Sequence, residues 1–218
     1  MNILAVDTSS NLLSYSITKN NNLIYQYNRI IDKGSSLLIN KLEKSFKQRA
    51  MQVEDFDLFV IGSGPGSFTG LRISFAIVKA FALAAKKPVF CQNSFFACAY
   101  PFRKEAKKIA VVADAKKDLV YASFFSSNQK QLKQKSKPKL MKLKDCLEKG
   151  KGHLFLTYDS CLREKAQTLK KDIMFSQKNA YPRAKYFVEG NNFGKINYSL
   201  SKLKPLYLHS IDCQVTKK

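Results

Sequence analysis

The pattern of apolar and polar positions divides the first hundred residues into strands and helices. Short apolar runs predict strands, and runs in which every third or fourth residue is apolar predict helices. The expected strands are residues 2–6, 12–18, 23–31, 56–61 and 88–91. The expected helices run from Ser35 or Ser36 to about Met51, from the loop at residue 70 to about Lys86, and over residues 94–100. This order predicts a mixed α/β sheet flanked by helices.

The pattern changes after Pro101, where the chain becomes rich in lysine. Residues 109–114 and 119–125 predict a hairpin, residues 153–158 a strand and residues 161–171 a helix. The polar run 126–137 is expected to be a loop, and residues 205–208 an extended tail. We therefore divide the chain into a first domain, 1–103, and a smaller lysine-rich second domain, 104–218.

A glycine-rich turn joins the fourth strand to the second helix, with the sequence GPGSFTGLRI at residues 64–73. Glycine lacks a Cβ atom, so such a turn lets its backbone approach other groups closely. The amides of a new helix also attract anions. The candidate anion or interface residues are Gly64, Gly66, Ser67, Thr69, Gly70 and Arg72. The alternative is that the glycines serve only to pack the turn.

The turn does not match the common catalytic or nucleotide-binding loops. A phosphate loop needs Lys and Ser or Thr after its second glycine, whereas Leu71 and Arg72 follow Gly70. The dinucleotide fingerprint needs a third glycine where Ser67 stands. A nucleophile elbow needs glycines two residues to either side of a serine, and neither Ser63 nor Ser67 has them.

The second helix is apolar nearly all round. Its polar exceptions between residues 71 and 85 are Arg72, Ser74 and Lys79. Such a helix is buried on more than one side. We expect the face with Ile73, Ile77, Ala80 and Ala84 to cover the sheet. Phe75, Val78 and Ala82 then need a second cover, either elsewhere in this chain or on another protein.

The charge is strongly positive and unevenly distributed. The net charge is +22, with +5 in residues 1–100 and +17 in residues 101–218. Residues 130–151 alone hold nine lysines and two acidic residues. Lysine-rich surfaces bind polyanions by releasing counterions. Lysine outnumbers arginine 32 to 6, however, and an AT-rich coding sequence would produce the same bias. The charge permits RNA contact without proving it.

Cysteine usage and hydropathy predict a cytoplasmic protein. The five cysteines are scattered and lack a CxxC pair, which fits a reducing compartment. The chain starts directly with a strand, so no signal peptide is expected. The most apolar stretch, residues 75–85, contains Lys79 and is too short to cross a bilayer, so no membrane role is expected.

Four segments resemble the TsaB (YeaZ) family, the relatives of TsaD that take part in tRNA threonylcarbamoyladenosine biosynthesis. These are Asp7-Thr8-Ser9, the loop GPGSFTGLRI, the turn at residues 113–116 and the tail at 205–208. The resemblance implies an actin/Hsp70-like (ASKHA) first domain and a reduced second domain. It also implies work with TsaD and the ATPase TsaE on the tRNA adenosine next to the anticodon.

The resemblance places the contact with TsaD on the first two helices, and it leaves a homodimer through the same face open for the free protein. The expected interface residues are Leu38, Leu42, Phe46, Phe75, Ile77, Val78 and Ala82. By analogy with ASKHA enzymes, Asp7, Thr8 and Ser9 form a vestigial nucleotide site. The glycine usual in that hairpin is absent here, and the alternative for Asp7 is a turn-stabilising carboxylate.

No set of catalytic or metal-binding residues can be assembled. His153 and His209 are isolated, and Gly34-Ser35 stands where the family often has His-Ser. We expect no metal and no cofactor bound by this chain alone, with ATP or ADP left open at an interface with partners. The resulting hypothesis is a non-catalytic subunit that binds and activates TsaD. The alternative is a small ASKHA-type kinase or hydrolase with its own active site.

Overall fold

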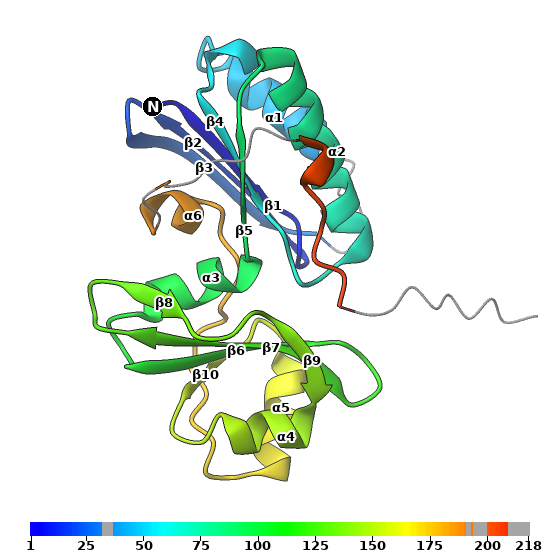
Figure 1. The fold of residues 1–218 in the computed structure, drawn as a ribbon, viewed down its shortest axis with the longest axis vertical. Coiled ribbons are helices and arrows are strands. Elements are labelled where there is room, and N and C mark those ends of the chain that lie inside the picture. Colours follow the sequence, from blue (N-terminus) through cyan, green and yellow to red (C-terminus); the bar gives the residue numbers. More distant parts are fainter. Residues whose placement is uncertain (32–36, 191–192, 194–199, 209–218) are drawn as a thin grey trace, which may run out of the picture.

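The computed structural model describes residues 1–31, 37–190, 193 and 200–208, which form two sheets with helices around them (Figure 1). The first sheet has the order β3-β2-β1-β4-β5, with β1 at its centre. Leu4 of β1 lies opposite Ile17 of antiparallel β2 and opposite Phe59 of parallel β4. The strands are β1 (Ile3–Asp7), β2 (Leu12–Lys19), β3 (Asn22–Ile30), β4 (Leu58–Gly62) and β5 (Val89–Gln92). The predicted mixed sheet is confirmed.

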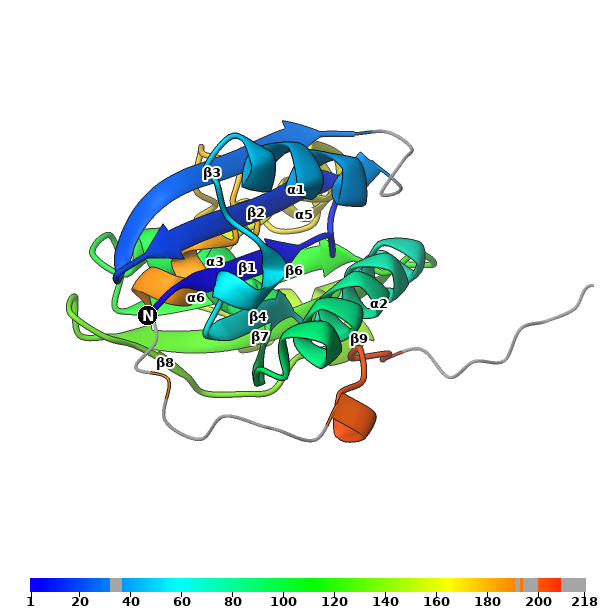
Figure 2. The ribbon, with the colours of Figure 1, turned by 90° about the horizontal axis from the view of Figure 1, so that it is seen from above.

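Helices α1 (Leu37–Lys47) and α2 (Phe68–Ala85) cover one face of this sheet (Figures 1 and 2). Successive side chains of a strand point to opposite faces, so Leu4 and Val6 of β1 meet these helices. The helices contribute Leu38, Leu42, Phe46, Phe75, Val78 and Ala82 to the same core. The predicted capping residues Ser35 and Ser36 lie outside the described residues.

Helices α3 (Ser94–Ala99) and α6 (Lys185–Glu189) cover the opposite face. Phe187 of α6 is fully buried with Ile3 and Val60 of the sheet. Just before α6, the backbone N–H of Ala184 donates a 2.8 Å hydrogen bond to Ser14 Oγ in β2. The chain therefore returns to the first sheet after building the second one.

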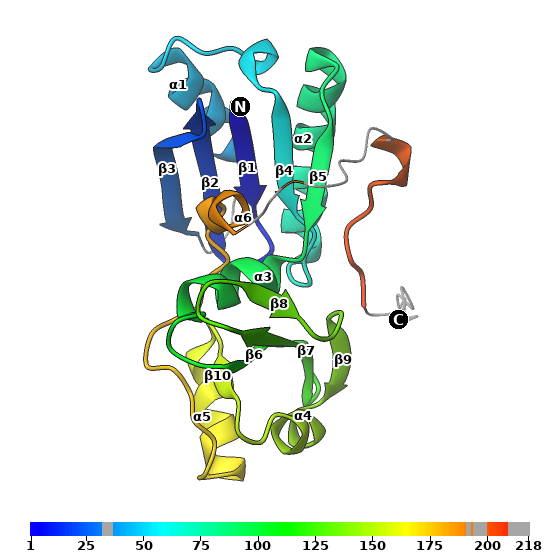
Figure 3. The same ribbon diagram turned by 60° about the vertical axis from the view of Figure 1, so that its left-hand side comes forward.

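The second sheet has the order β10-β6-β7-β8, and β9 also pairs with β7. Its strands are β6 (Lys108–Asp114), β7 (Leu119–Ser127), β8 (Leu132–Gln134), β9 (Lys139–Lys142) and β10 (Leu154–Leu156). Helices α4 (Leu143–Lys149) and α5 (Ser160–Leu169) pack on one face. Helix α3 lies between the two sheets (Figure 3), where Phe95 and Cys98 pack with Ile109. Three 3-10 turns complete the description: Val53–Asp55, Tyr100–Phe102 and Leu200–Lys202.

The lysine-rich half differs from the expectation in detail. The hairpin over residues 109–125, the strand near residue 155 and helix α5 are confirmed. The prediction of a loop over residues 126–137 is wrong in part, because β8 lies within it. Residue 103 separates the strands of the two sheets, but the segment 184–189 and buried Leu203 pack on the first unit. The predicted second domain thus contributes its last part to the first unit.

Helix α2 is longer than the apolar stretch recognised in the sequence. The 18 residues of the whole helix are long and apolar enough, by length and composition alone, to cross a membrane, although the stretch 75–85 singled out in the sequence is shorter. Core helices satisfy the same test. One side of α2, with Phe75 and Val78, packs on the sheet.

Candidate functional site

The carboxylate of Asp7 is completely buried at the carboxyl end of β1. Its Oδ1 atom accepts hydrogen bonds from the Ser9 backbone N–H at 2.8 Å and from Ser9 Oγ at 2.7 Å. Its Oδ2 atom accepts a third, from Ser94 Oγ at 2.6 Å. Burial raises the pKa of Asp7 to about 6, and these hydrogen bonds oppose the rise. Asp7 therefore ties the β1–β2 hairpin to the start of α3.

The glycines of the loop are explained by close packing against this hairpin. A Cβ atom at Gly62 would lie 1.8 Å from Asp7 Oδ2, and one at Gly66 would lie 1.9 Å from the Ser9 carbonyl oxygen. A Cβ at Gly70 would lie 2.1 Å from the Thr8 carbonyl oxygen. No larger residue fits without moving the Asp7 carboxylate at Gly62 or the hairpin backbone at Gly66 and Gly70, so glycine is needed here whether or not an anion binds.

Internal partners already occupy much of the polar backbone of the loop. The N–H of Ser67 donates to the Ser9 carbonyl at 2.7 Å, and the N–H of Gly64 donates to Ser94 Oγ at 2.9 Å. Ser67 caps α2 by accepting from the N–H of Gly70 at 3.2 Å. The Arg72 guanidinium stacks on the Phe68 ring at 3.7 Å instead of reaching over the loop. These contacts favour the packing explanation over the anion site. Thr69 is exposed and does not help to decide between the two.

A polar cleft of about 630 Å³ lies between the two units. The β1–β2 hairpin and the glycine loop line one wall, and the β6–β7 turn, the start of α5 and residues 179–181 line the other. Hydroxyl and amide groups dominate the lining: Ser9, Ser10, Asn11, Ser67, Tyr121, Tyr158, Ser160, Asn179 and Tyr181. The cleft brings Ser9 together with the turn at residues 114–116, two of the segments that carried the family resemblance.

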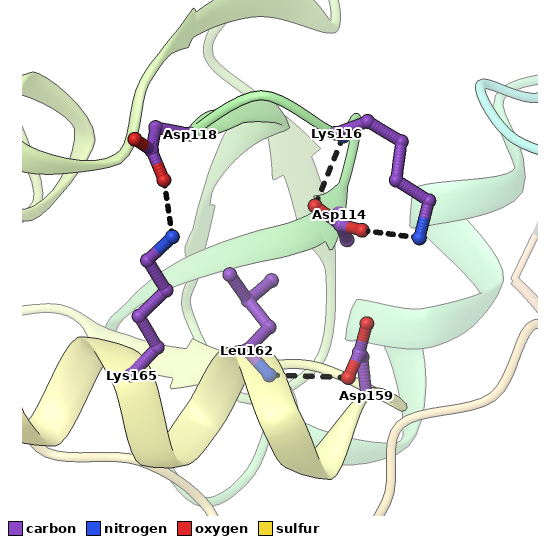
Figure 4. A network of polar contacts seen from close by, with 6 residues as sticks. All are labelled: Asp114, Lys116, Asp118, Asp159, Leu162 and Lys165. Atoms are coloured by element: carbon purple, nitrogen blue, oxygen red, sulfur yellow. Dashed lines mark hydrogen bonds and ion pairs between the residues drawn. The ribbon is translucent and has the colours of Figure 1, made fainter.

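Two of the three charged side chains that line the cleft, Asp114 and Lys116, form an ion pair (Figure 4). Lys116 Nζ pairs with Asp114 Oδ2 at 2.8 Å, and the Lys116 N–H donates to Asp114 Oδ1 at 3.0 Å. Partial burial raises the pKa of Asp114, but these bonds hold it below its ordinary value. Asp159 caps α5 by accepting from the N–H of Leu162 at 3.1 Å. The cleft thus offers few free charges to a ligand.

The described residues do not fit magnesium and a triphosphate held as ASKHA enzymes hold them. Both oxygens of Asp7 accept hydrogen bonds from serines, and the Ser9 backbone presses against Gly66 where the loop would need room. Lys116, the one lysine lining the cleft among the described residues, is paired with Asp114. Nor does the described part of the chain contain a group of three His, Cys, Asp or Glu side chains suited to a metal. These contacts favour the turn-stabilising role of Asp7.

Comparison with known proteins identifies a matching family model and several relatives of this chain. A family model described as TsaD: tRNA N6-adenosine threonylcarbamoyltransferase matches residues 32–204. The tRNA threonylcarbamoyladenosine biosynthesis protein TsaB of Buchnera aphidicola subsp. Schizaphis graminum is 30% identical over 191 residues, which cover 84% of this chain and 89% of that one. This chain belongs to the TsaB family. Bacillus subtilis TsaB is 27% identical over 169 residues, covering 75% and 74% of the two chains.

The fold of the TsaB family is matched in full. YeaZ from Pseudomonas aeruginosa superposes with a TM-score of 0.77 at 18% identity, over 95% of this chain and 99% of that one. The α/β architecture of mixed sheets with flanking helices, expected for an actin/Hsp70-like protein, is therefore shown.

The residues predicted to form the partner interface lie on the buried sides of α1 and α2 instead of on the surface. Six of the seven residues are buried in this chain's own core: Leu38, Leu42, Phe46, Phe75, Val78 and Ala82. Ile77 is half-buried beside the same core. The predicted orientation of α2 is wrong in part, because Phe75, Val78 and Ala82 face the sheet, whereas Ala80 and Ala84, predicted to cover it, are exposed. Its outward face carries Ala76, Ala80, Leu83 and Ala84.

Several cleft residues of this TsaB protein were missed in the sequence. Tyr158 and Tyr181 stack with ring centroids 5.6 Å apart, and burial raises the pKa of Tyr158 well above its ordinary value. Arg163 Nη2 donates to Asn179 Oδ1 at 2.9 Å and so orients that amide. Asp159 carried a usable signal, an acidic residue directly before a helix. Tyr158 lies just after β10, whereas Asn179 and Tyr181 meet the cleft only because the chain returns to the first unit after α5. His153 packs edge-on against Phe124, and His209 lies outside the described residues.

Proposed function

We propose that this protein is a non-catalytic subunit that binds and activates TsaD, with TsaE as a further partner and tRNA as the substrate of the assembled complex. Its family supports the pathway, because the named relatives are tRNA threonylcarbamoyladenosine biosynthesis proteins. ATP or ADP, where it takes part, belongs to an interface with these partners, since the polar groups around Asp7 already bond to one another.

The observation that carries the proposal is the outward face of α2. Ala76, Ala80, Leu83 and Ala84 follow helical spacing along one side and are exposed, and Leu83 has 71% of its surface accessible. Neighbouring α1 exposes Leu37 and Ile39 on the same side of the sheet. Small side chains let another helix approach closely, and leucine supplies apolar area to bury. Two adjacent helices with such a surface suit a helical partner face.

The test is association with TsaD after a charge is placed on this face. Leu83→Glu is expected to weaken association at least about tenfold, since a carboxylate would be buried unpaired. Met174→Glu is the matched control, because Met174 is 63% exposed in the second unit. Both variants should retain the circular dichroism spectrum of the wild type. Unchanged TsaD binding by Leu83→Glu would refute the interface. Loss of self-association without loss of TsaD binding would assign the face to a homodimer instead.

The non-catalytic part of the proposal has its own test. The protein alone is expected to show no threonylcarbamoyl transfer and no ATP hydrolysis, because Asp7 is engaged with Ser9 and Ser94. Steady hydrolysis by the lone chain that Asp7→Ala abolishes would favour the kinase or hydrolase alternative.

A further inference from the structure

A second concavity of the second unit shares the β6–β7 turn and helix α5 with the cleft but is lined by other residues of them. Four segments converge there: the β6–β7 turn, the end of β9, the start of α4 and the outer side of α5. The cavity measures about 560 Å³, and each segment contributes one lysine, Lys117, Lys142, Lys144 and Lys165. We call this cavity the lysine pocket. The acidic residues of its lining are Asp118 and Asp145, so positive charge is in excess by two.

The pocket is held in shape by contacts between these segments. Lys165 of α5 pairs with Asp118 of the turn (Figure 4). The N–H of Leu143 donates to the Asp118 carbonyl at 3.0 Å, which joins the start of α4 to the same turn. Leu119 lies opposite Lys142 in the β7–β9 register. The lysines therefore project from fixed backbone positions.

The turn itself adopts a conformation that side chains disfavour. Lys116, Lys117 and Asp118 have φ angles of 67°, 51° and 61°, three consecutive left-handed residues without a glycine. Each such residue costs about 1 kcal/mol or more. Backbone strain of this kind persists only where surrounding contacts hold it, and here the bond from the Leu143 N–H to the Asp118 carbonyl is one such contact.

The available charge points to an anionic ligand. Among the described residues, none forms an ion pair with Lys117, Lys142 or Lys144, and all three are exposed. The floor is apolar, formed by Leu119, buried Leu143 and partly exposed Leu169. Apolar walls reduce screening and strengthen lysine–phosphate attraction. Two of the segments that line the pocket, β9 and the β6–β7 turn, lie on the same side of the molecule as α2 in Figures 1 and 2.

We propose that the lysine pocket binds backbone phosphates of tRNA. This inference rests on the proposed function, in which tRNA is the substrate of the assembled complex. RNA is the ligand we choose because its backbone carries a row of phosphates, and each lysine contact with it releases condensed counterions. The surrounding half of the chain, residues 101–218, carries a net +17 that adds to the attraction. A tRNA bound to a partner on α1 and α2 would thus have a second anchor on this subunit.

The test compares two double variants of the full chain with equal charge change. Lys117→Glu/Lys144→Glu alters the pocket. Lys130→Glu/Lys133→Glu is the control, because Lys133 pairs opposite Ser126, at the other end of β7 from Leu119. Binding of an unmodified tRNA transcript is measured from about 50 to 200 mM salt. The pocket variant should lose at least about tenfold in affinity and about two units of the slope of log K against log salt, with smaller losses in the control.

The remaining arms separate this inference from its alternatives. Lys117→Arg/Lys144→Arg keeps the charge and should retain most of the affinity. Equal losses in the two Glu variants, or no loss in either, would overturn the pocket as the site. Polyglutamate that competes as well as tRNA would overturn the assignment to RNA. TsaD association, measured separately on the same proteins, tests the proposed function, so the two ideas can fail independently.

Discussion

The buried carboxyl group of Asp7 makes a specific prediction about stability and pH. Its pKa is about 6 in the folded protein, raised by burial, against an ordinary value of 3.8. A difference of about two pKa units corresponds to about 3 kcal/mol. Between pH 3.8 and about pH 6, the folded protein keeps the proton on Asp7, whereas the unfolded chain has released it. Asp7 therefore contributes stability at about pH 4 that is lost as the pH rises through about 6.

Replacing Asp7 with asparagine isolates this contribution. The asparagine amide cannot ionise, so the variant lacks the pH dependence that Asp7 introduces. It also loses one acceptor for the Ser94 hydroxyl, which adds a constant offset of about 1–2 kcal/mol. Relative to the wild type, the free energy of unfolding of Asp7→Asn should improve by about 3 kcal/mol between about pH 4 and pH 7.

The assay is urea unfolding followed by far-ultraviolet circular dichroism at closely spaced pH values. Other carboxylates titrate in the same range in both proteins, so the difference between the two curves is the quantity of interest. Ser94→Ala serves as a control. It removes one of the hydrogen bonds that lower the pKa of Asp7, so its stability should fall through a higher pH range than that of the wild type. Parallel curves for Asp7→Asn and the wild type would refute the reasoning.

Two further substitutions test the packing of the first unit. Gly70→Ala should destabilise by about 3 kcal/mol, because its Cβ would meet the Thr8 carbonyl oxygen at 2.1 Å, whereas Gly152→Ala, with nothing within 4 Å, should cost about 1 kcal/mol for its positive φ. Equal losses in urea unfolding would argue against the close approach. Val78→Glu should destabilise by about 4 kcal/mol or more and lose the native circular dichroism spectrum, since Val78 is fully buried. A folded Val78→Glu protein that only fails to bind TsaD would restore the interface first predicted from the sequence.

The buried side of a helix can be predicted only where apolar and polar residues fall on different sides of it. In α1, Leu38, Leu42 and Phe46 recur at helical spacing among polar residues, and they are the buried side. In α2 nearly every position is apolar, so periodicity alone does not identify the buried face. Side-chain size does not identify it either, because small Ala82 is buried with Phe75 and Val78, whereas Leu83 is exposed among the outward alanines.

The cleft was predictable only on its first wall. Asp7, Ser9 and the glycine loop adjoin strands whose parallel pairing follows from the order of elements, so their meeting could be expected. Tyr181 and Asn179 reach the cleft because the chain leaves α5 and runs back to the first sheet, a path set by tertiary packing of Phe187.

The short strands β8 and β9 could not be predicted, because they consist largely of exposed lysine and half-buried residues and lack a strong alternation of apolar and polar positions.

The position of α3 has a consequence for movement between the units. Every residue of this helix is buried, and its side chains are shared between the first sheet and the second. The polypeptide also passes between the units twice, before β6 and again before α6. A buried helix shared by both sheets, together with two chain crossings, resists rotation of one unit against the other. The width of the cleft therefore depends on how far the two sheets can slide over α3. The hydrogen bond from Ser94 to Asp7 joins β1 to this helix, so a displacement of β1 would act directly on α3.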